Sequence, residues 1–275
     1  MSNSTPVRRR AAFVFGPPVI AAAVGVVLLT QGAAGSNFEI LEQRRQERIE
    51  SGWVVPTPEF TDYLYTNFLT TVASSDMVIV NKHNALDPVD YAPTVREVES
   101  SAALDNSRGL TLRPIAASAL EEMAQDMHDA GAGVMFVNSA YRSYDYQAEL
   151  FVQKTEQYGL EEALVRSAKP GHSEHQTGLA VDVSVPAQGC AIMQCFGDTE
   201  AGQWIAENAW RFGFVVRYEL DTVATTGYTY EPWHLRFVGK AVTEMYHEKG
   251  IHTLEEFWGY PAAPSYPEIA SSTTD

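Results

Sequence analysis

Basic residues are scarce in this sequence. Its 275 residues include 19 lysines and arginines against 35 aspartates and glutamates, which gives a formal net charge of −16. Proteins that bind nucleic acids need a basic surface to pair with phosphates, so this balance argues against a nucleic-acid partner. Internal repeats are also missing, and hydrophobic residues make up 45% of the chain, which is enough for a folded core. No feature of the sequence indicates a protein partner.

Cysteine is scarcer still. Cys190 and Cys195 are the only two, and they lie close together in the segment GCAIMQCFG (189–197). A structural zinc site would need more cysteines or nearby histidines, and this segment has neither. In an oxidising compartment such a pair forms a local disulfide, so we predict a Cys190–Cys195 bridge.

The signatures of serine peptidases are absent. The motifs S-x-x-K and K-T-G of penicillin-binding enzymes do not occur, and neither does the nucleophile motif G-x-S-x-G. The segment HEKGIH (247–252) resembles a metalloprotease helix signature, but Gly250 interrupts it and its histidines are five residues apart. Such histidines would not share a helix face, so we interpret this segment as a helix end.

The N-terminal region predicts export. Residues 11–30 carry no charge and follow three arginines at 8–10. A helix of this length reaches ~30 Å, the thickness of the hydrocarbon core of a bilayer. We therefore predict a membrane anchor within residues 11–35, with residues 1–10 in the cytoplasm. The alternative is a signal peptide cleaved near residue 35, after the small residues GAAG (32–35). Both alternatives place the remaining chain outside the cytoplasm.

Composition divides that remaining chain into three parts. Residues 36–59 are first charged and helix-prone and then interrupted by glycine and proline, which indicates a juxtamembrane stalk or linker. Residues 261–275 are rich in proline, serine and threonine and predict a disordered tail. The intervening residues 60–260 have the length of one ordinary domain.

Periodicity within this domain predicts interleaved helices and strands. Apolar residues at helical spacing predict a helix that ends before Gly131, and further helices are expected at 145–159, 199–213 and 240–250. Strands are expected within 132–143, whose end is polar, and at 178–185, 213–218 and 233–239. Several strands follow one another without a crossover helix. This favours an α+β fold with a mostly antiparallel sheet flanked by helices.

Polar residues at the ends of these strands form a candidate metal site. His175 precedes the strand expected at 178–185, and Asp182 lies within it. Glu231 and His234 lie where the last strand begins. Two histidines and one carboxylate are a set of three zinc ligands that leaves the fourth tetrahedral position for water. Glu231 is then available as a general base that takes the proton of this water. We expect one Zn²⁺ per chain on the active-site face of the sheet.

An arginine near the first strand suggests recognition of a carboxylate. Arg142 lies in SAYRSYDYQ (139–147), beside the hydroxyl group of Ser143. An enzyme that acts at a C-terminus must bind a free carboxylate, and a guanidinium group does so with a planar pair of hydrogen bonds. Arg142 and Ser143 are therefore candidate substrate-binding residues.

The full pattern, S-x-H-x-x-G-x-A-x-D followed by E-x-W-H, resembles the VanY-type zinc-dependent D-alanyl-D-alanine carboxypeptidases, a group related to VanX and to tetrapeptide L,D-carboxypeptidases. The resemblance runs through 80–93, 139–147, 169–184, 225–239 and 253–257. It implies that His175, Asp182 and His234 bind zinc, that Glu231 is the catalytic base, and that Arg142 binds substrate or stabilises the tetrahedral intermediate. It further implies that Gln147 and Ser173 line the pocket for the terminal residue.

The resemblance predicts an extracytoplasmic enzyme that removes the terminal D-alanine from peptidoglycan stem peptides. One segment departs from the family pattern: RYELDTVATTGY (217–228) lacks the proline and lysine that usually follow the arginine and tyrosine. We expect this segment to affect substrate preference and to leave the metal chemistry unchanged. Two alternatives stay open, an L,D-carboxypeptidase acting on tetrapeptide stems and a module that binds wall peptides without catalysis.

Overall fold

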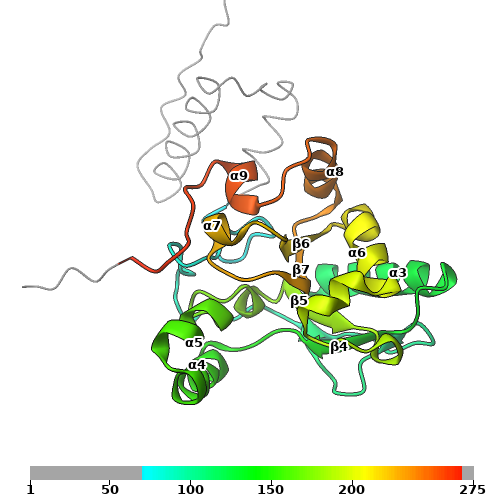
Figure 1. Cartoon of the computed structure of the whole chain (residues 1–275), viewed down its shortest axis with the longest axis horizontal. Helices are drawn as coiled ribbons and strands as arrows, with labels where there is room; N and C mark the ends of the chain where they lie inside the picture. Colours follow the sequence, from blue (N-terminus) through cyan, green and yellow to red (C-terminus); the bar gives the residue numbers. More distant parts are fainter. Residues whose placement is uncertain (1–69, 268–275) are drawn as a thin grey trace, which may run out of the picture.

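The computed structural model describes residues 70–267, in which helices surround a central sheet (Figure 1). The helices are α3 (Pro114–Asp129), α4 (Tyr144–Tyr158), α5 (Leu160–Arg166), α6 (Glu200–Asn208), α7 (Val223–Thr226), α8 (Lys240–Glu248) and α9 (Leu254–Trp258). The strands are β1 (Arg96–Glu97), β2 (Leu104–Asp105), β3 (Thr111–Leu112), β4 (Met135–Ser139), β5 (Ala180–Ser184), β6 (Phe214–Tyr218) and β7 (Glu231–Phe237). Four short 3₁₀ turns lie at Glu174–Thr177, Pro186–Gln188, Gln194–Asp198 and Ala209–Phe212. This architecture confirms the predicted α+β class.

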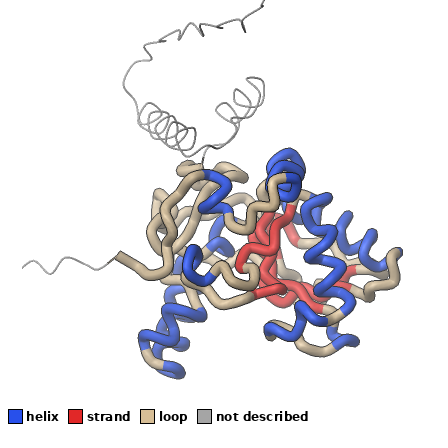
Figure 2. The backbone as a smooth tube through the Cα atoms, turned by 45° about the horizontal axis from the view of Figure 1, so that its top comes forward, coloured by secondary structure: helices blue, strands red, loops and turns tan. Residues whose placement is uncertain are grey.

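Five strands form the central sheet in the order β2-β4-β5-β7-β6. Figure 2 shows the strands at the centre of the domain with helices around them. β4, β5, β7 and β6 pair antiparallel with their neighbours, and β2 joins β4 in parallel. β1 and β3 form a separate antiparallel pair. In the central pair, Asp182 of β5 lies opposite His234 of β7. Residues directly opposite each other in an antiparallel pair project from the same face, so these two side chains are neighbours.

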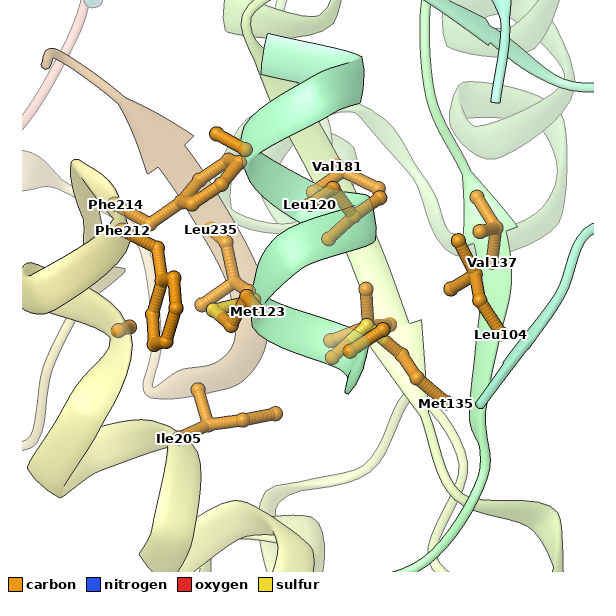
Figure 3. Packing of buried hydrophobic residues seen from close by; sticks show 14 of the residues in the cluster. Leu104, Leu120, Met123, Met135, Val137, Val181, Ile205, Phe212, Phe214 and Leu235 are labelled. Atoms are coloured by element: carbon orange, nitrogen blue, oxygen red, sulfur yellow. The ribbon is translucent and has the colours of Figure 1, made fainter. Parts of the chain in front are cut away.

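Helix α3 covers one face of the sheet. Pro114 occupies its first turn, where the missing N–H costs no helical hydrogen bond. The predicted apolar positions Ala116, Leu120, Met123 and Met127 are all fully buried. Figure 3 shows Leu120 and Met123 packed over strand residues that include Val181 and Leu235, with Ile205 and Phe212 alongside. Because side chains alternate along a strand, the neighbours of Val181 and Leu235 project to the opposite face.

Helices α4 and α5 lie away from α3 and α6, on another side of the molecule (Figure 1). Ser143 caps α4, since its hydroxyl oxygen accepts a hydrogen bond from the backbone N–H of Tyr146 at 3.2 Å. Gly159 adopts a φ of +82° between the two helices, a conformation that glycine reaches without strain. The two helices therefore fold back on each other.

The C-terminal segment differs from the prediction. Residues 261–267 pack against the domain, although the sequence predicts a disordered tail from residue 261. Ala263 is fully buried, and its N–H donates to the carbonyl oxygen of Thr225 at 2.7 Å. The hydroxyl oxygen of Tyr266 accepts a hydrogen bond from the backbone N–H of Lys169 at 2.8 Å. The predicted tail therefore starts too early, because specific contacts hold a segment that forms no helix or strand.

The predicted anchor or signal peptide at 11–35 and the predicted stalk at 36–59 lie outside the described residues. Among residues 70–267, no helix has the length and apolar character needed to cross a membrane.

Candidate active site

Three potential metal ligands converge beside β5. His175, Asp182 and His234 each offer one ligand atom, and these atoms lie within 4.8 Å of one another. Asp182 and His234 are on paired strands, and His175 lies in the 3₁₀ turn that precedes β5. This turn ends at Gly178, whose φ is +69°, and a Cβ there would lie 3.0 Å from the side chain of Arg113. Glycine is needed at this position to lead the chain from His175 into the strand.

Hydrogen bonds determine which nitrogen atom each histidine presents. Nδ1 of His175 lies 2.7 Å from the carbonyl oxygen of Ala140, to which it donates, and Nε2 lies 3.2 Å from Oδ2 of Asp182. Nδ1 of His234 lies 2.9 Å from Oδ1 of Asp182, and Nε2 lies 3.4 Å from Oε2 of Glu174. Metal-binding histidines usually donate their other N–H to a carbonyl or carboxylate. His175 is therefore arranged to bind a metal through Nε2, and His234 through Nδ1.

The chemistry of this donor set fits zinc. Zinc binds imidazole nitrogen and carboxylate oxygen in a tetrahedral arrangement, and three such protein ligands leave one position open. Burial, assisted by the charge of Arg142, lowers the pKa of His175 to about 4, so its imidazole stays neutral. Burial opposes ionisation of Asp182, but His175 and His234 outweigh it and hold the pKa of this carboxyl well below its usual range. Both groups are thus in the protonation state that a metal ligand requires. Burial opposes protonation of His234, but its hydrogen bonds to Asp182 and Glu174 outweigh it and raise its pKa to about 9, so zinc binding would displace a proton from this imidazole.

Glu174, which the sequence analysis did not single out, supports this site. Its Oε1 accepts hydrogen bonds from Nε of Arg217 at 2.9 Å and from Nη1 of Arg236 at 3.0 Å, while its Oε2 faces His234. Arg217 also binds both carboxylate oxygens of Glu255, at 2.9 and 2.6 Å. Each of these four charged residues is at most 2% exposed. Two positive and two negative groups balance, which makes the burial of all four tolerable.

Glu231 begins β7, three residues before His234, and faces the same cleft. Burial raises the pKa of Glu231 to about 7, with Asp182 adding to this shift and His234 and Arg142 opposing it. A carboxyl group whose pKa lies near neutrality can both accept and return a proton, which suits a general base.

Arg142 follows β4, and its backbone N–H donates to the carbonyl oxygen of His175 at 3.2 Å. Burial lowers the pKa of its guanidinium group, and Asp182 and Glu231 oppose this shift. Its Nε is buried and has no hydrogen-bond partner among the described residues. A buried donor without a partner costs free energy until a ligand pairs with it. The arrangement indicates an anionic group of a substrate near this nitrogen.

These side chains line one cleft of about 330 Å³, which contains Arg142, Ser173, His175, Asp182, Glu231 and His234. The family model of the VanY D-alanyl-D-alanine carboxypeptidases matches residues 109–240, a range that includes all six. The D-alanyl-D-alanine carboxypeptidase of Enterococcus faecium is 32% identical over 238 residues, which cover 82% of this chain and 69% of that protein.

This chain belongs to the VanY family. Two solved structures support the assignment. The LdcB LD-carboxypeptidase is 36% identical, with a TM-score of 0.61 over 69% of this chain and 88% of that one. A variant of the vancomycin resistance D,D-pentapeptidase VanY, in complex with Zn(II), is 30% identical, with a TM-score of 0.55 over 66% of this chain and 97% of that one.

The remaining residues predicted to bind substrate occupy different environments. Ser173 is buried and lines the cleft. Gln147 is fully buried outside the lining, and its Nε2 donates to Oγ of Ser167 at 3.3 Å and to the carbonyl oxygen of Ala168 at 2.7 Å. Because Ser167 and Ala168 do line the cleft, Gln147 supports its wall through these two residues and does not line the cleft itself. Ser143 also lies outside the lining, where its hydroxyl group caps α4.

The segment that departs from the VanY pattern forms another wall of the cleft, to which Tyr218 and Tyr228 contribute. Nζ of Lys82 donates to the carbonyl oxygens of Gly227 at 2.5 Å and Pro264 at 3.3 Å, and it lies 4.5 Å from the centre of the Tyr228 ring. Lys82 thereby joins this wall to the C-terminal segment. Burial lowers the pKa of Lys82 to about 8.

The predicted disulfide between Cys190 and Cys195 is present. It closes a short loop that carries Ile192, and Ile192 lines the cleft. The bridge therefore constrains a segment of the cleft wall.

Proposed function

We propose that this protein is an extracytoplasmic zinc carboxypeptidase that removes the terminal D-alanine from peptidoglycan stem peptides. The observation that carries the proposal is the meeting of His175, Asp182 and His234 with Glu231 and Arg142 in one cleft. Membership of the VanY family supports the reaction and the substrate class.

Each of these residues has a distinct task in the proposed reaction. His175, Asp182 and His234 hold one zinc ion, which when bound supplies Lewis acidity that activates water and polarises the scissile carbonyl. Glu231 takes the proton of the attacking water and passes it to the leaving amine. Arg142 pairs with the terminal carboxylate through its planar guanidinium group.

An L,D-carboxypeptidase that acts on tetrapeptide stems is the second candidate. The likeness to the LdcB LD-carboxypeptidase favours it, and the same metal site would serve both reactions. A module that only binds wall peptides would not need a base with the raised pKa of Glu231. We therefore favour a catalytic role.

The proposed substrate is a wall component, which agrees with the predicted export of the chain. In this proposal residues 11–30 anchor the domain in the cell membrane with the N-terminus inside, or the domain is released after cleavage near residue 35.

Incubation of the zinc-loaded protein with tri-, tetra- and pentapeptide stems tests the function, with the products read by mass spectrometry. We expect loss of D-alanine from the pentapeptide, full inhibition by a chelator and no inhibition by β-lactams. A stem amidated at its C-terminus should be spared, because it lacks the charge that pairs with Arg142. Cleavage of the tetrapeptide alone would favour the L,D-carboxypeptidase, and the absence of any cleavage would favour a binding module.

A further inference from the structure

The cleft extends past the metal-binding residues to a second group of side chains on α4 and α5. Leu150, Lys154 and Tyr158 line it from α4, and Arg166 lines it from the end of α5. The three positions on α4 are spaced by four residues, which puts them on one face of the helix. This part of the cleft, lined by Leu150, Lys154, Tyr158 and Arg166, is called the outer end below.

The outer end is positive, in contrast to the rest of this acidic protein. The three acidic residues that line the cleft, Glu174, Asp182 and Glu231, all lie at its metal-binding end. Within residues 70–267, Arg166 pairs with Glu162, with 2.6 Å between Nε and Oε1, whereas Lys154 has no carboxylate partner. Two cations and one carboxylate leave an excess positive charge at this position.

Lys154 and Arg166 both contact the ring of Tyr158. Nζ of Lys154 lies 5.5 Å from the ring centre, and Cζ of Arg166 lies 5.3 Å from it. Contacts of this kind are attractive for each cation separately. They also place both cations beside the same ring, at the same end of the cleft.

We propose that the outer end is a subsite for a second carboxylate of the substrate, carried by the second or third residue of the stem peptide. This inference rests on the proposed function and names the substrate class. A carboxypeptidase has a single residue on the leaving side of the scissile bond. This D-alanine carries one carboxylate, which the proposed function pairs with Arg142. A second carboxylate therefore belongs to the residues that precede the scissile bond.

Two carboxylates of stem peptides meet this requirement. One is the free side-chain carboxylate of a diaminopimelate at the third position, and the other is the α-carboxylate of a γ-linked D-glutamate at the second. A lysine at the third position would instead bring an ammonium group towards Lys154 and Arg166. The outer end thus selects stems by charge at a distance from the reacting bond.

The test compares pentapeptide stems that differ only in charge. One stem carries both free carboxylates, a second is amidated at the side chain of diaminopimelate, and a third carries D-isoglutamine in place of D-glutamate. For the zinc-loaded full chain we expect kcat/KM to be about three- to fivefold higher for the free stem than for one amidated stem, through KM. Which amidation lowers it identifies the carboxylate that binds. The preference should shrink at high salt, because the pair is partly exposed.

Variants attribute the preference to the outer end. Lys154→Gln should remove the difference between free and amidated stems, and Lys154→Arg should keep it. Lys240→Gln is the matched control, since it removes an equal charge on α8, where Lys240 pairs with Glu122 outside the cleft. Equal kcat/KM for all three stems, or a preference that survives in Lys154→Gln, would overturn the subsite and leave the proposed function intact. Failure to cleave any stem would overturn the proposed function itself.

Discussion

The floor and the walls of the cleft are held in place by different means. On the floor, Asp182 and His234 face each other across β5 and β7, and their neighbours Val181 and Leu235 are paired in the same register and fully buried. The walls are α4 with α5, and the segment around Tyr228, which Lys82 fastens through its side chain. Backbone pairing fixes the floor, whereas single side chains fix much of the walls. We infer that the chemistry depends on the sheet and that substrate choice depends on the walls.

The largest expected effect concerns Glu231, which the proposed function assigns as the base and not as a metal ligand. Glu231→Gln should keep one zinc ion per chain while kcat falls at least ~10²-fold, the usual contribution of a positioned base. Steady-state kinetics and elemental analysis of the same sample measure both quantities. Glu156→Gln, an exposed position on α4, serves as the control. Loss of zinc in Glu231→Gln would show that Glu231 is a ligand, which would contradict the assigned roles.

Glu174 should affect zinc binding through its contact with His234. Glu174→Gln removes the carboxylate that faces Nε2 of this histidine, so we expect zinc affinity to fall by ~10- to 100-fold. Competition with a chelator measures the affinity without relying on activity. Glu121→Gln is a matched control, because Glu121 pairs with Arg96 on the surface. If Glu174→Gln loses thermal stability and keeps its zinc affinity, Glu174 supports only the fold.

The dependence of activity on pH should report the titration of Glu231. Below its pKa Glu231 is protonated and cannot accept a proton, so kcat/KM should fall tenfold per pH unit as the pH decreases through this pKa. Burial raises the pKa of Glu231 to about 7 in the absence of metal, and the charge of zinc would lower it. The acidic limb should therefore lie at or below about pH 7 in the zinc enzyme. Its persistence in Glu231→Gln would assign the limb to another group.

The parts that could be predicted from the sequence depend on local patterns. The buried positions of α3 follow a helical period, and His175, Asp182 and His234 occur in short motifs beside strands. Even so, the helix expected at 199–213 ends at Asn208 and continues as a 3₁₀ turn to Phe212. Local propensity does not define where packing ends a helix.

The missed features depend on partners that are distant in the sequence. Arg217 binds Glu255, 38 residues away, and Arg236 binds Glu174, 62 residues away. On apolar strands, isolated arginines give no sign of their partners in a single sequence. Tyr266 packs on the loop at Lys169, 97 residues away. This contact could not be predicted either, because the composition around Tyr266 is typical of disorder.

A change in the walls should affect substrate binding more than chemistry. Deletion of residues 261–275 removes the carbonyl oxygen of Pro264 that binds Lys82 and the Tyr266 hydroxyl that binds the loop at Lys169. We expect KM to rise several-fold, with a smaller change in kcat and no loss of zinc. Deletion of residues 268–275 alone is the control and should leave KM unchanged. An equal loss of kcat and zinc in the longer deletion would show that the segment also supports the floor.

The smallest effect is expected at Ser143, which the sequence placed in the substrate site and the structure places at the N-terminus of α4. Loss of an N-cap hydroxyl costs about 1 kcal/mol of the free energy of unfolding, so Ser143→Ala should lower Tm by a few degrees. Thr199 caps α6 in the same way, with its hydroxyl oxygen accepting from the N–H of Gly202 at 3.1 Å, so Thr199→Ala should cause a similar loss. Ser143→Asp preserves the capping oxygen and should restore stability. KM should stay unchanged in Ser143→Ala. A rise in KM that Thr199→Ala does not share would show that Ser143 contacts the substrate. The N-terminus of α4 would then belong to the substrate-binding wall of the cleft.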